Sequence, residues 1–263
     1  MAATAEDHVV GSSSWREAGD GPPVVFLHGL GGTRSAWEPQ LRGLSDRFRC
    51  IAWDMPGYGD AAAIDPLTYG AIADRLVALL DVLEVAVADL VGLSFGGMHA
   101  LHTALRHPER VGRLVLVDTS PAFGMDGTRP DDWRRARLAP IEGGATPADM
   151  APDVLDAIAG MPLDPDIRRE LIEAFGRISV TGFRAAVECL PTNDIRDRLG
   201  AIRHPSLVIV GSEDFETPVE YARVLADGLA DSELHIVEGA GHLTPAEVPA
   251  RFNDLVADFL QRG

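Results

Sequence analysis

Ser94 has neighbours whose types and spacing could make it a nucleophile. It stands in Gly92-Leu93-Ser94-Phe95-Gly96-Gly97, directly after an apolar run and directly before a helix-like segment. This Gly-x-Ser-x-Gly pattern predicts a strand–turn–helix so tight that a side chain at Gly92 or Gly96 would collide with the chain around it. The serine is then exposed at a helix N-terminus, which favours developing negative charge. The pattern predicts attack of Ser94 on a carbonyl carbon, with a solvated serine in a glycine-rich turn as the alternative.

A serine nucleophile needs a base, and His242 is the best candidate. It follows a strand-like run through Glu238-Gly239-Ala240-Gly241. Such a loop lets a histidine turn back over the C-terminal edge of a sheet, where Ser94 is expected. The weaker candidates lie on or at the end of the helix after Ser94, within an expected strand, or near the N-terminus: His99, His102, His107, His235 and His8.

The base in turn needs an orienting carboxylate, and we assign this role to Asp214. It lies in Gly211-Ser212-Glu213-Asp214, between an apolar run and a predicted helix. Loops at the C-terminal ends of parallel strands are where such sheets place their chemistry. A carboxylate there can accept a hydrogen bond from Nδ1 of His242. The competitors are Glu213, whose side chain should point elsewhere, and Asp118, which ends the preceding strand.

An oxyanion hole requires two backbone N–H donors. Phe95, directly after the nucleophile, should supply one of them. The second is expected from the loop His28-Gly29-Leu30-Gly31-Gly32, where the glycines let the main chain approach a substrate carbonyl; Leu30 is our choice. Loss of one such donor costs about 3 kcal/mol in the barrier. We expect His28 to hydrogen-bond the backbone and shape this loop rather than to act in catalysis.

The composition indicates an acidic globular protein. Its 263 residues suffice for one large α/β domain, with or without an inserted cap, or for two small domains. Acidic residues outnumber basic ones 40 to 23, which gives a net charge of −17. Such a surface repels phosphate backbones and anionic membrane surfaces, so we expect no nucleic-acid or membrane partner.

Cysteine usage and the N-terminal residues point to a cytoplasmic protein. Cys50 and Cys189 are too few for a disulfide framework and have no metal-ligand spacing, so no metal site is expected. Residues 1–7 lack the basic and apolar regions of a secretion signal, and no apolar run approaches 18 residues. The sequence indicates no particular oligomeric state.

Short apolar runs alternate with helical patterns, which predicts right-handed βαβ crossovers and a doubly wound, mostly parallel sheet. The runs are continuous and rich in β-branched residues, as expected for strands buried on both faces. They are Val24–Leu27, Arg49–Trp53, Asp89–Val91, Leu114–Val117, Leu207–Val210 and Leu234–Val237. Thr217-Pro218-Val219-Glu220 predicts a capping box at a helix start, and Ala246–Leu260 predicts a C-terminal helix.

The segment from residue 120 to residue 189 has helical patterns and no convincing strand. We predict that it is a helical cap inserted after the sixth strand, and that residues 1–119 and 190–263 form the core domain. Its apolar side chains could roof a pocket over Ser94, among them Trp133, Leu138, Ile141 and Phe175. Its arginines are interleaved with acids and are expected on a solvated helix face rather than in an anion site: Arg129, Arg134, Arg135 and Arg137.

Five stretches, taken in order, resemble the α/β-hydrolase superfamily over nearly the whole chain. They are the His28-Gly29 loop, Trp53-Asp54-Met55-Pro56-Gly57-Tyr58-Gly59, the turn at Ser94, the stretch from Gly211 to Pro218, and Gly239-Ala240-Gly241-His242. Within the superfamily the chain is most similar to 3-oxoadipate enol-lactonases and related carboxylesterases, through Leu30-Gly31, residues 36–41, and Asp214 followed by Thr217-Pro218. Relatives often have serine where this chain has Asp60, and methionine or glutamine where it has Phe95.

The resemblance implies the α/β-hydrolase fold and hydrolysis of a small carboxylic ester or lactone without a cofactor. Ser94, Asp214 and His242 would form the triad, with an acyl-enzyme as the intermediate. Two alternatives stay open: C–C bond hydrolysis of ring-cleavage diketones by the same triad, and a ligand-binding protein on this fold. Cofactor-free perhydrolysis of small acids is a further variant.

Overall fold

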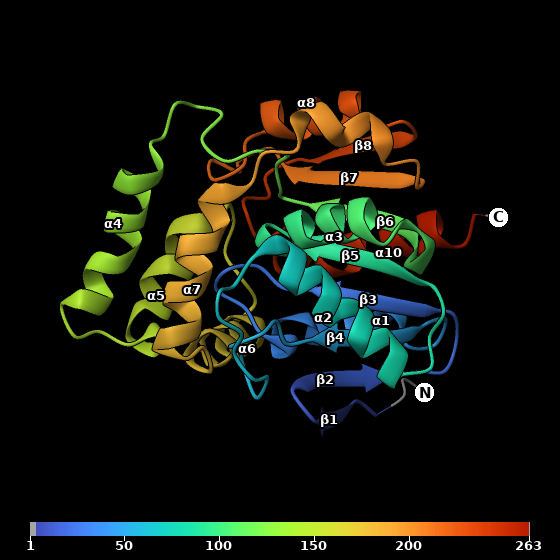
Figure 1. Cartoon of the computed structure of the whole chain (residues 1–263), viewed down its shortest axis with the longest axis horizontal. Coiled ribbons are helices and arrows are strands. Elements are labelled where there is room, and N and C mark those ends of the chain that lie inside the picture. Colours follow the sequence, from blue (N-terminus) through green and yellow to red (C-terminus); the bar gives the residue numbers. More distant parts are fainter. Residues whose placement is uncertain (1–3, 263) are drawn as a thin grey trace.

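The computed structural model describes residues 4–262 and has an eight-stranded sheet at its centre (Figure 1). The strand order is β1-β2-β4-β3-β5-β6-β7-β8. All neighbours from β4 to β8 pair in parallel, whereas β2 is antiparallel to both β1 and β4. The strands are β1 Glu6–Val10, β2 Ser13–Ala18, β3 Pro23–Leu27, β4 Arg49–Trp53, β5 Ala88–Leu93, β6 Val111–Val117, β7 Ser206–Gly211 and β8 Ser232–Val237. This is the doubly wound, mostly parallel sheet that the sequence predicts.

Helices cover both faces of the sheet, which explains the continuous apolar runs. In β3, Val25 and Leu27 belong to a core cluster that also holds residues of α2, α3 and α8, while Val24 and Phe26 belong to a cluster on the opposite face with residues of α1 and α10. The helices are α1 Glu38–Leu44, α2 Tyr69–Val82, α3 Phe95–Arg106, α8 Val219–Gly228, α9 Thr244–Glu247 and α10 Pro249–Leu260. Short 3₁₀ helices lie at Arg34–Trp37, Pro108–Arg110, Leu190–Thr192 and Arg196–Ala201. Within residues 4–262, no helix is both long and apolar enough to cross a bilayer.

Four helices follow the sixth strand, between β6 and β7, as the sequence predicts. They are α4 Pro130–Glu142, α5 Pro147–Ile158, α6 Pro165–Gly176 and α7 Val180–Cys189. They lie together beyond one end of the sheet (Figure 1). Helix α5 packs on α6, and α4 packs on α7. The division of the chain into a core domain and a cap domain at residues 119/120 and 189/190 stays a prediction.

The N-terminal hairpin of β1 and β2 was not predicted from the sequence. Every residue of β1 except His8 is exposed, so the strand carries no apolar pattern. The hairpin is held from its sides instead: the His8 ring stacks on Trp15 with 5.1 Å between centroids. Asp7 accepts hydrogen bonds from the guanidinium groups of Arg16 and Arg34, each at 2.9 Å. The bonds from Arg16 lie within the hairpin, whereas the bond from Arg34 ties the hairpin to the segment that follows β3.

Two local predictions were wrong near the C-terminus. The capping box does not form, because α8 begins at Val219 and the Thr217 hydroxyl donates to Asp214 instead, at 2.8 Å. The single helix over Ala246–Leu260 is two helices that meet at Val248. Pro249 explains this break, because a proline disfavours helical geometry in the residue before it.

Candidate active site

Ser94 lies between the last residue of β5 and the first residue of α3, in a strained backbone conformation. Its φ of 54° and ψ of −117° are rare for a residue with a side chain. Two hydrogen bonds hold the turn: the Ser94 N–H donates to the Val117 carbonyl at 2.8 Å, and the Thr119 hydroxyl donates to the Ser94 carbonyl at 2.7 Å. Strand β6 and the residues that follow it therefore hold the serine in this conformation.

The glycines of the turn are required by close backbone contacts, as predicted. A Cβ atom at Gly92 would collide with the main chain of Gly96 and Gly97. A Cβ atom at Gly96 would collide with the carbonyl groups of Leu27 and His28. The start of α3 is thus pressed against the loop after β3, and this contact brings the two predicted oxyanion donors to the same place.

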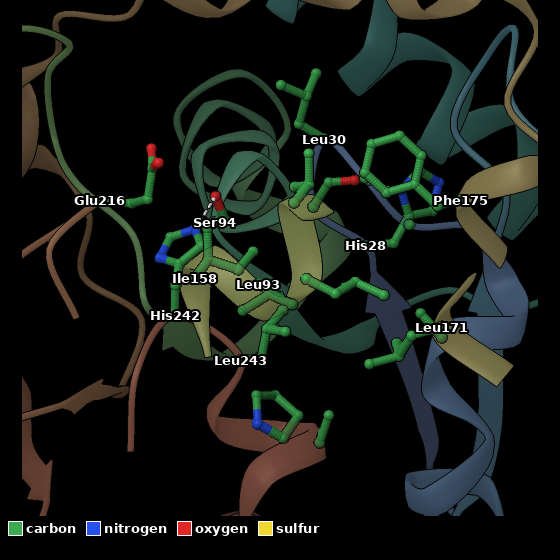
Figure 2. Close-up of a pocket in the computed structure, with 18 of the residues that line it drawn as sticks. His28, Leu30, Leu93, Ser94, Ile158, Leu171, Phe175, Glu216, His242 and Leu243 are labelled. Carbon is green, nitrogen blue, oxygen red and sulfur yellow. Dashed lines mark hydrogen bonds between the residues drawn. The ribbon is translucent and has the colours of Figure 1, made fainter. Parts of the chain in front are cut away.

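The structure brings Ser94, His242 and Asp214 into one hydrogen-bonded chain. Figure 2 shows the contact between Ser94 and His242. The Ser94 hydroxyl and Nε2 of His242 are 2.9 Å apart, and Nδ1 of His242 lies 2.9 Å from Oδ2 of Asp214. The three residues follow β5, β8 and β7, so each is held at the same edge of the sheet. His242 is 7% exposed and Asp214 is 3% exposed. This arrangement can pass a proton from the serine to the imidazole while the carboxylate fixes the ring.

Backbone donors and the imidazole together stabilise Asp214 as a carboxylate. Oδ1 accepts the N–H groups of Glu216 at 2.9 Å and Thr217 at 3.0 Å. Burial opposes ionisation, but the charge of His242 and these hydrogen bonds outweigh it and lower the pKa of Asp214. Burial likewise opposes protonation of His242, yet the charge and hydrogen bond of Asp214 outweigh it and raise the pKa of His242 above its ordinary value.

The two competing acids have other partners. Asp118 is fully buried and accepts hydrogen bonds from the Gly211 N–H at 3.1 Å and from the N–H and hydroxyl of Thr244, both at 3.0 Å. Burial, with the nearby charge of Asp214, raises the pKa of Asp118 to about 7. Glu213 is exposed, and its carboxylate accepts a hydrogen bond from Ser212 at 3.2 Å. Asp118 therefore braces the loops of β7 and β8 beneath the imidazole.

Glu247 holds the histidine loop, and sequence reasoning missed it. Its buried carboxylate accepts the N–H groups of Gly241 and Leu243, which flank His242, at 2.9 and 3.0 Å. It also accepts the N–H groups of Gly160 at 2.8 Å and Met161 at 3.0 Å, just beyond α5. The carboxylate thus joins the histidine loop to the inserted helices. The partners are all backbone groups, so no pattern of side-chain types could reveal this contact.

The predicted oxyanion donors lie on adjoining turns and have no acceptor among residues 4–262. Phe95 is the first residue of α3, so its N–H has no partner within the helix. The Leu30 N–H makes no protein hydrogen bond either, although the Leu30 carbonyl accepts the hydroxyl of Tyr58 at 3.1 Å. Both N–H groups are therefore available to a ligand beside Ser94.

His28 shapes the oxyanion loop, as predicted. Its Nδ1 donates to the Gly29 carbonyl at 2.9 Å, and its Nε2 accepts the N–H of Met55 at 3.0 Å. Burial lowers the pKa of His28, which favours the neutral ring that this pair of bonds needs.

Asp60 is the residue at which this chain departs from the family pattern. Its carboxylate accepts hydrogen bonds from Arg34 at 2.7 Å and from Arg177 at 2.8 Å, and so connects this region to the end of α6.

The other histidines have partners away from Ser94. His99 contacts the sulfur of Met55 at 2.9 Å, His102 the side chain of Asn193 at 3.0 Å, and His107 the carboxylate of Asp74 at 2.7 Å. His235 lies on edge strand β8 and His8 on edge strand β1. Of the histidines that were compared as bases, His242 is the one in contact with the serine.

A cavity of about 140 Å³ opens over Ser94 and is lined mostly by apolar side chains. Trp133 and Phe175 line it as predicted, whereas Leu138 and Ile141 pack in the hydrophobic core. Figure 2 shows Leu93, Ile158, Leu171, Phe175 and Leu243 around it.

Three arginines of the basic stretch pair with neighbouring acids on the cap surface, namely Arg129, Arg134 and Arg135. The fourth, Arg137, instead lines the cavity and pairs with Glu216, a contact the sequence did not indicate.

Comparisons with known proteins agree with this architecture. The family model described as the alpha/beta hydrolase fold matches residues 22–248. The chain is 35% identical to a 2-hydroxymuconate semialdehyde hydrolase of a Pseudomonas species, over 93% of this chain and 88% of the relative. It is 28% identical to 3-oxoadipate enol-lactonase 2 of Acinetobacter baylyi, over 98% and 96% of the two chains. The solved enol-lactonase of Burkholderia xenovorans superposes with a TM-score of 0.83 at 26% identity, covering 98% of this chain and 100% of that one. The chain therefore belongs to the α/β-hydrolase family.

Proposed function

We propose that this chain is a serine hydrolase that cleaves a small carboxylic ester or lactone. The observation that carries the proposal is the unbroken hydrogen-bonded chain from Ser94 through His242 to Asp214, with two N–H groups beside it that lack a protein acceptor. A protein that only binds a ligand needs no such chain. The enol-lactonases among its relatives support the choice of ester or lactone.

In the first half of the reaction, Ser94 attacks the carbonyl carbon of the substrate. Nε2 of His242 takes the serine proton and then gives it to the departing alkoxide oxygen, which leaves the acyl group on the serine. Asp214 accepts the Nδ1–H bond throughout, which keeps the ring in the required tautomer and stabilises the imidazolium. In the second half, His242 deprotonates a water molecule that attacks the acyl carbonyl. The imidazolium then returns this proton to the Ser94 oxygen as the acyl–serine bond breaks and the acid departs.

The N–H groups of Leu30 and Phe95 hold the negative charge that develops on the carbonyl oxygen. They act in a largely apolar cavity, where a hydrogen bond to an oxyanion is stronger than in water. Each donor lowers the barrier by about 3 kcal/mol. The start of α3 adds the positive end of its dipole at the same place.

A second candidate is C–C bond hydrolysis by the same three residues. It is favoured by the 35% identity with the 2-hydroxymuconate semialdehyde hydrolase. The two candidates differ in the bond that breaks. Ester or lactone hydrolysis protonates a leaving oxygen, whereas C–C hydrolysis protonates a leaving carbon. A panel of substrates separates them.

The test is steady-state hydrolysis by the wild type and by Ser94→Ala. The panel holds short p-nitrophenyl esters, simple lactones, 3-oxoadipate enol-lactone and a ring-cleavage diketone. We expect turnover of esters or lactones that falls by about 10⁴- to 10⁶-fold in the variant, while its circular dichroism spectrum is unchanged. Turnover of the diketone alone would favour C–C hydrolysis. Near-wild-type rates in Ser94→Ala would contradict the proposal.

A further inference from the structure

An ion pair joins the inserted helices to the loop that carries Asp214. One nitrogen of the Arg137 guanidinium, Nη2, donates to both carboxylate oxygens of Glu216 at 2.7 Å. Arg137 comes from α4 and also lies over the Trp133 ring, 5.5 Å from its centroid. The side chains of Arg137 and Glu216 are 32% and 25% exposed, so the pair is partly desolvated.

The pair stands where two cavities meet. The apolar cavity over Ser94 is on one side, and a second cavity of about 180 Å³ is on the other. Both are lined by Ser94, His242, Trp133, Leu190 and the two members of the pair. The second has more polar walls, which include Ser120, Asp126, Thr128, Thr217 and Tyr221. Figure 2 shows Glu216 on the opposite side of Ser94 from Phe175 and Leu171.

The charges around the reacting serine are therefore balanced or negative. Apart from two histidines, Arg137 and Glu216 are the ionisable side chains among the described residues that line the apolar cavity, and their charges cancel. The second cavity adds Asp126 and so carries an excess of negative charge. A carboxylate on a substrate would have to displace Glu216 before it could use Arg137.

On the basis of the proposed function, we propose that the Arg137–Glu216 pair makes the site selective for uncharged substrates. Esters or lactones of apolar, uncharged acids would enter the cavity, whereas half-esters of dicarboxylic acids would meet a cation that is already neutralised. The Nε and Nη1 groups of Arg137 donate to no other residue among 4–262. Removal of the Glu216 charge therefore leaves a guanidinium that can take up a carboxylate without rearrangement of the backbone.

The test compares two esters that differ in one charged group. The measured quantity is the ratio of kcat/KM for mono-p-nitrophenyl adipate to kcat/KM for p-nitrophenyl hexanoate, after subtraction of spontaneous hydrolysis. In the wild type we expect this ratio to lie below one. In Glu216→Gln it should rise about tenfold or more, as expected for a new charge-assisted contact to the carboxylate. Glu216→Ala is a second variant that should move the ratio in the same direction.

Three further variants separate charge selection from other effects. Arg137→Gln should hold the ratio at or below the wild-type value, and the double variant Glu216→Gln/Arg137→Gln should lose the gain of the single one. Asp156→Asn is the matched control, since it releases Arg168 from an exposed pair on α5 and α6 and changes the net charge equally. It should leave the ratio unchanged.

A ratio that stays within twofold in Glu216→Gln, while hexanoate hydrolysis still depends on Ser94, would overturn the inference and leave the pair as a structural link. If neither ester is hydrolysed in a Ser94-dependent reaction, the proposed function fails instead. Charge selection is then tested by calorimetric binding of monomethyl adipate to Ser94→Ala and to Ser94→Ala/Glu216→Gln. Tighter binding to the double variant supports the inference, and equal binding contradicts it.

Discussion

The edge of the sheet and the inserted helices contribute to the site in different ways. At the sheet edge, Ser94, Asp214 and His242 follow parallel strands, and backbone hydrogen bonds fix the loop around each one. The helices α4–α6 contribute side chains such as Trp133 and Phe175, which line the cavity while their neighbours on the same helices pack in the core. The backbone of the core thus positions the three reacting side chains, whereas the side chains of the inserted helices shape the cavity that selects among substrates.

Among variants that keep the nucleophile, the largest effect should come from replacing the orienting acid. Asp214→Asn would present an amide to Nδ1 of His242 and favour the wrong tautomer, so we expect kcat to fall by about 10⁴-fold. Asp118→Asn is the matched control, because Asp118 is an equally buried acid whose hydrogen bonds run to Gly211 and Thr244. Its kcat should fall by less than about tenfold. Equal losses in both variants would contradict the assignment of Asp214.

The contact between the two regions is the next test. In Glu247→Gln, the amide nitrogen would face backbone N–H groups that need an acceptor, which costs about 1–3 kcal/mol in the free energy of unfolding. Because Gly241 and Leu243 flank His242, we also expect kcat to fall by about 10- to 100-fold. The exposed Glu220→Gln on α8 is the control. A stability loss with wild-type kcat would restrict Glu247 to a structural role.

The pH dependence reports on the electrostatics of the sheet edge. Catalysis requires neutral His242. Because the pKa of His242 is raised, the ring becomes protonated at a higher pH than an ordinary histidine does. The acid limb of kcat/KM for an uncharged ester should therefore have its midpoint above about 6.5, the ordinary value for histidine. Asp118→Asn removes a negative charge that favours the imidazolium, so its midpoint should move to lower pH. A midpoint below 6.5 in the wild type would contradict this arrangement.

The smallest effect should come from the insertion. Val154 lines the cavity from α5, and Val154→Ala enlarges the space by two methyl groups. We expect kcat/KM for longer acyl chains to rise relative to short ones by about tenfold, at the lower end of the roughly 1–3 kcal/mol that one methylene contributes to discrimination. Val180→Ala, on the exposed side of α7, should leave the chain-length profile unchanged. A large loss of kcat in Val154→Ala would break the separation between the two regions.

The difference between the sheet edge and the inserted helices also determined which features the sequence could predict. The parallel strands were predictable because burial on both faces makes them continuously apolar, as in β3. Ser94 and His242 were predictable because each sits in a glycine-marked loop after a strand, which few residue patterns share. The exposed strand β1 has no such pattern, and the sequence did not indicate it.

Residues that act through the backbone or across long separations were not predictable. Glu247 binds four backbone N–H groups, and any acid in an apolar stretch would look the same in sequence. Arg137 and Glu216 are 79 positions apart, so their pairing depends on how α4 lies against the β7 loop. The sequence pattern predicted that Thr217 caps a helix, whereas its hydroxyl donates to Asp214. That hydrogen bond depends on the tight turn between the two residues, which helix periodicity does not reveal.

The most direct test of the central claim is covalent labelling of Ser94 by an activated fluorophosphonate, with the modified peptide identified by mass spectrometry. The triad geometry predicts stoichiometric labelling of Ser94 in the wild type, labelling that is slower by orders of magnitude in His242→Ala, and none at this position in Ser94→Ala. Folded wild-type protein that leaves Ser94 unlabelled, or that is labelled as fast without His242, would contradict the account.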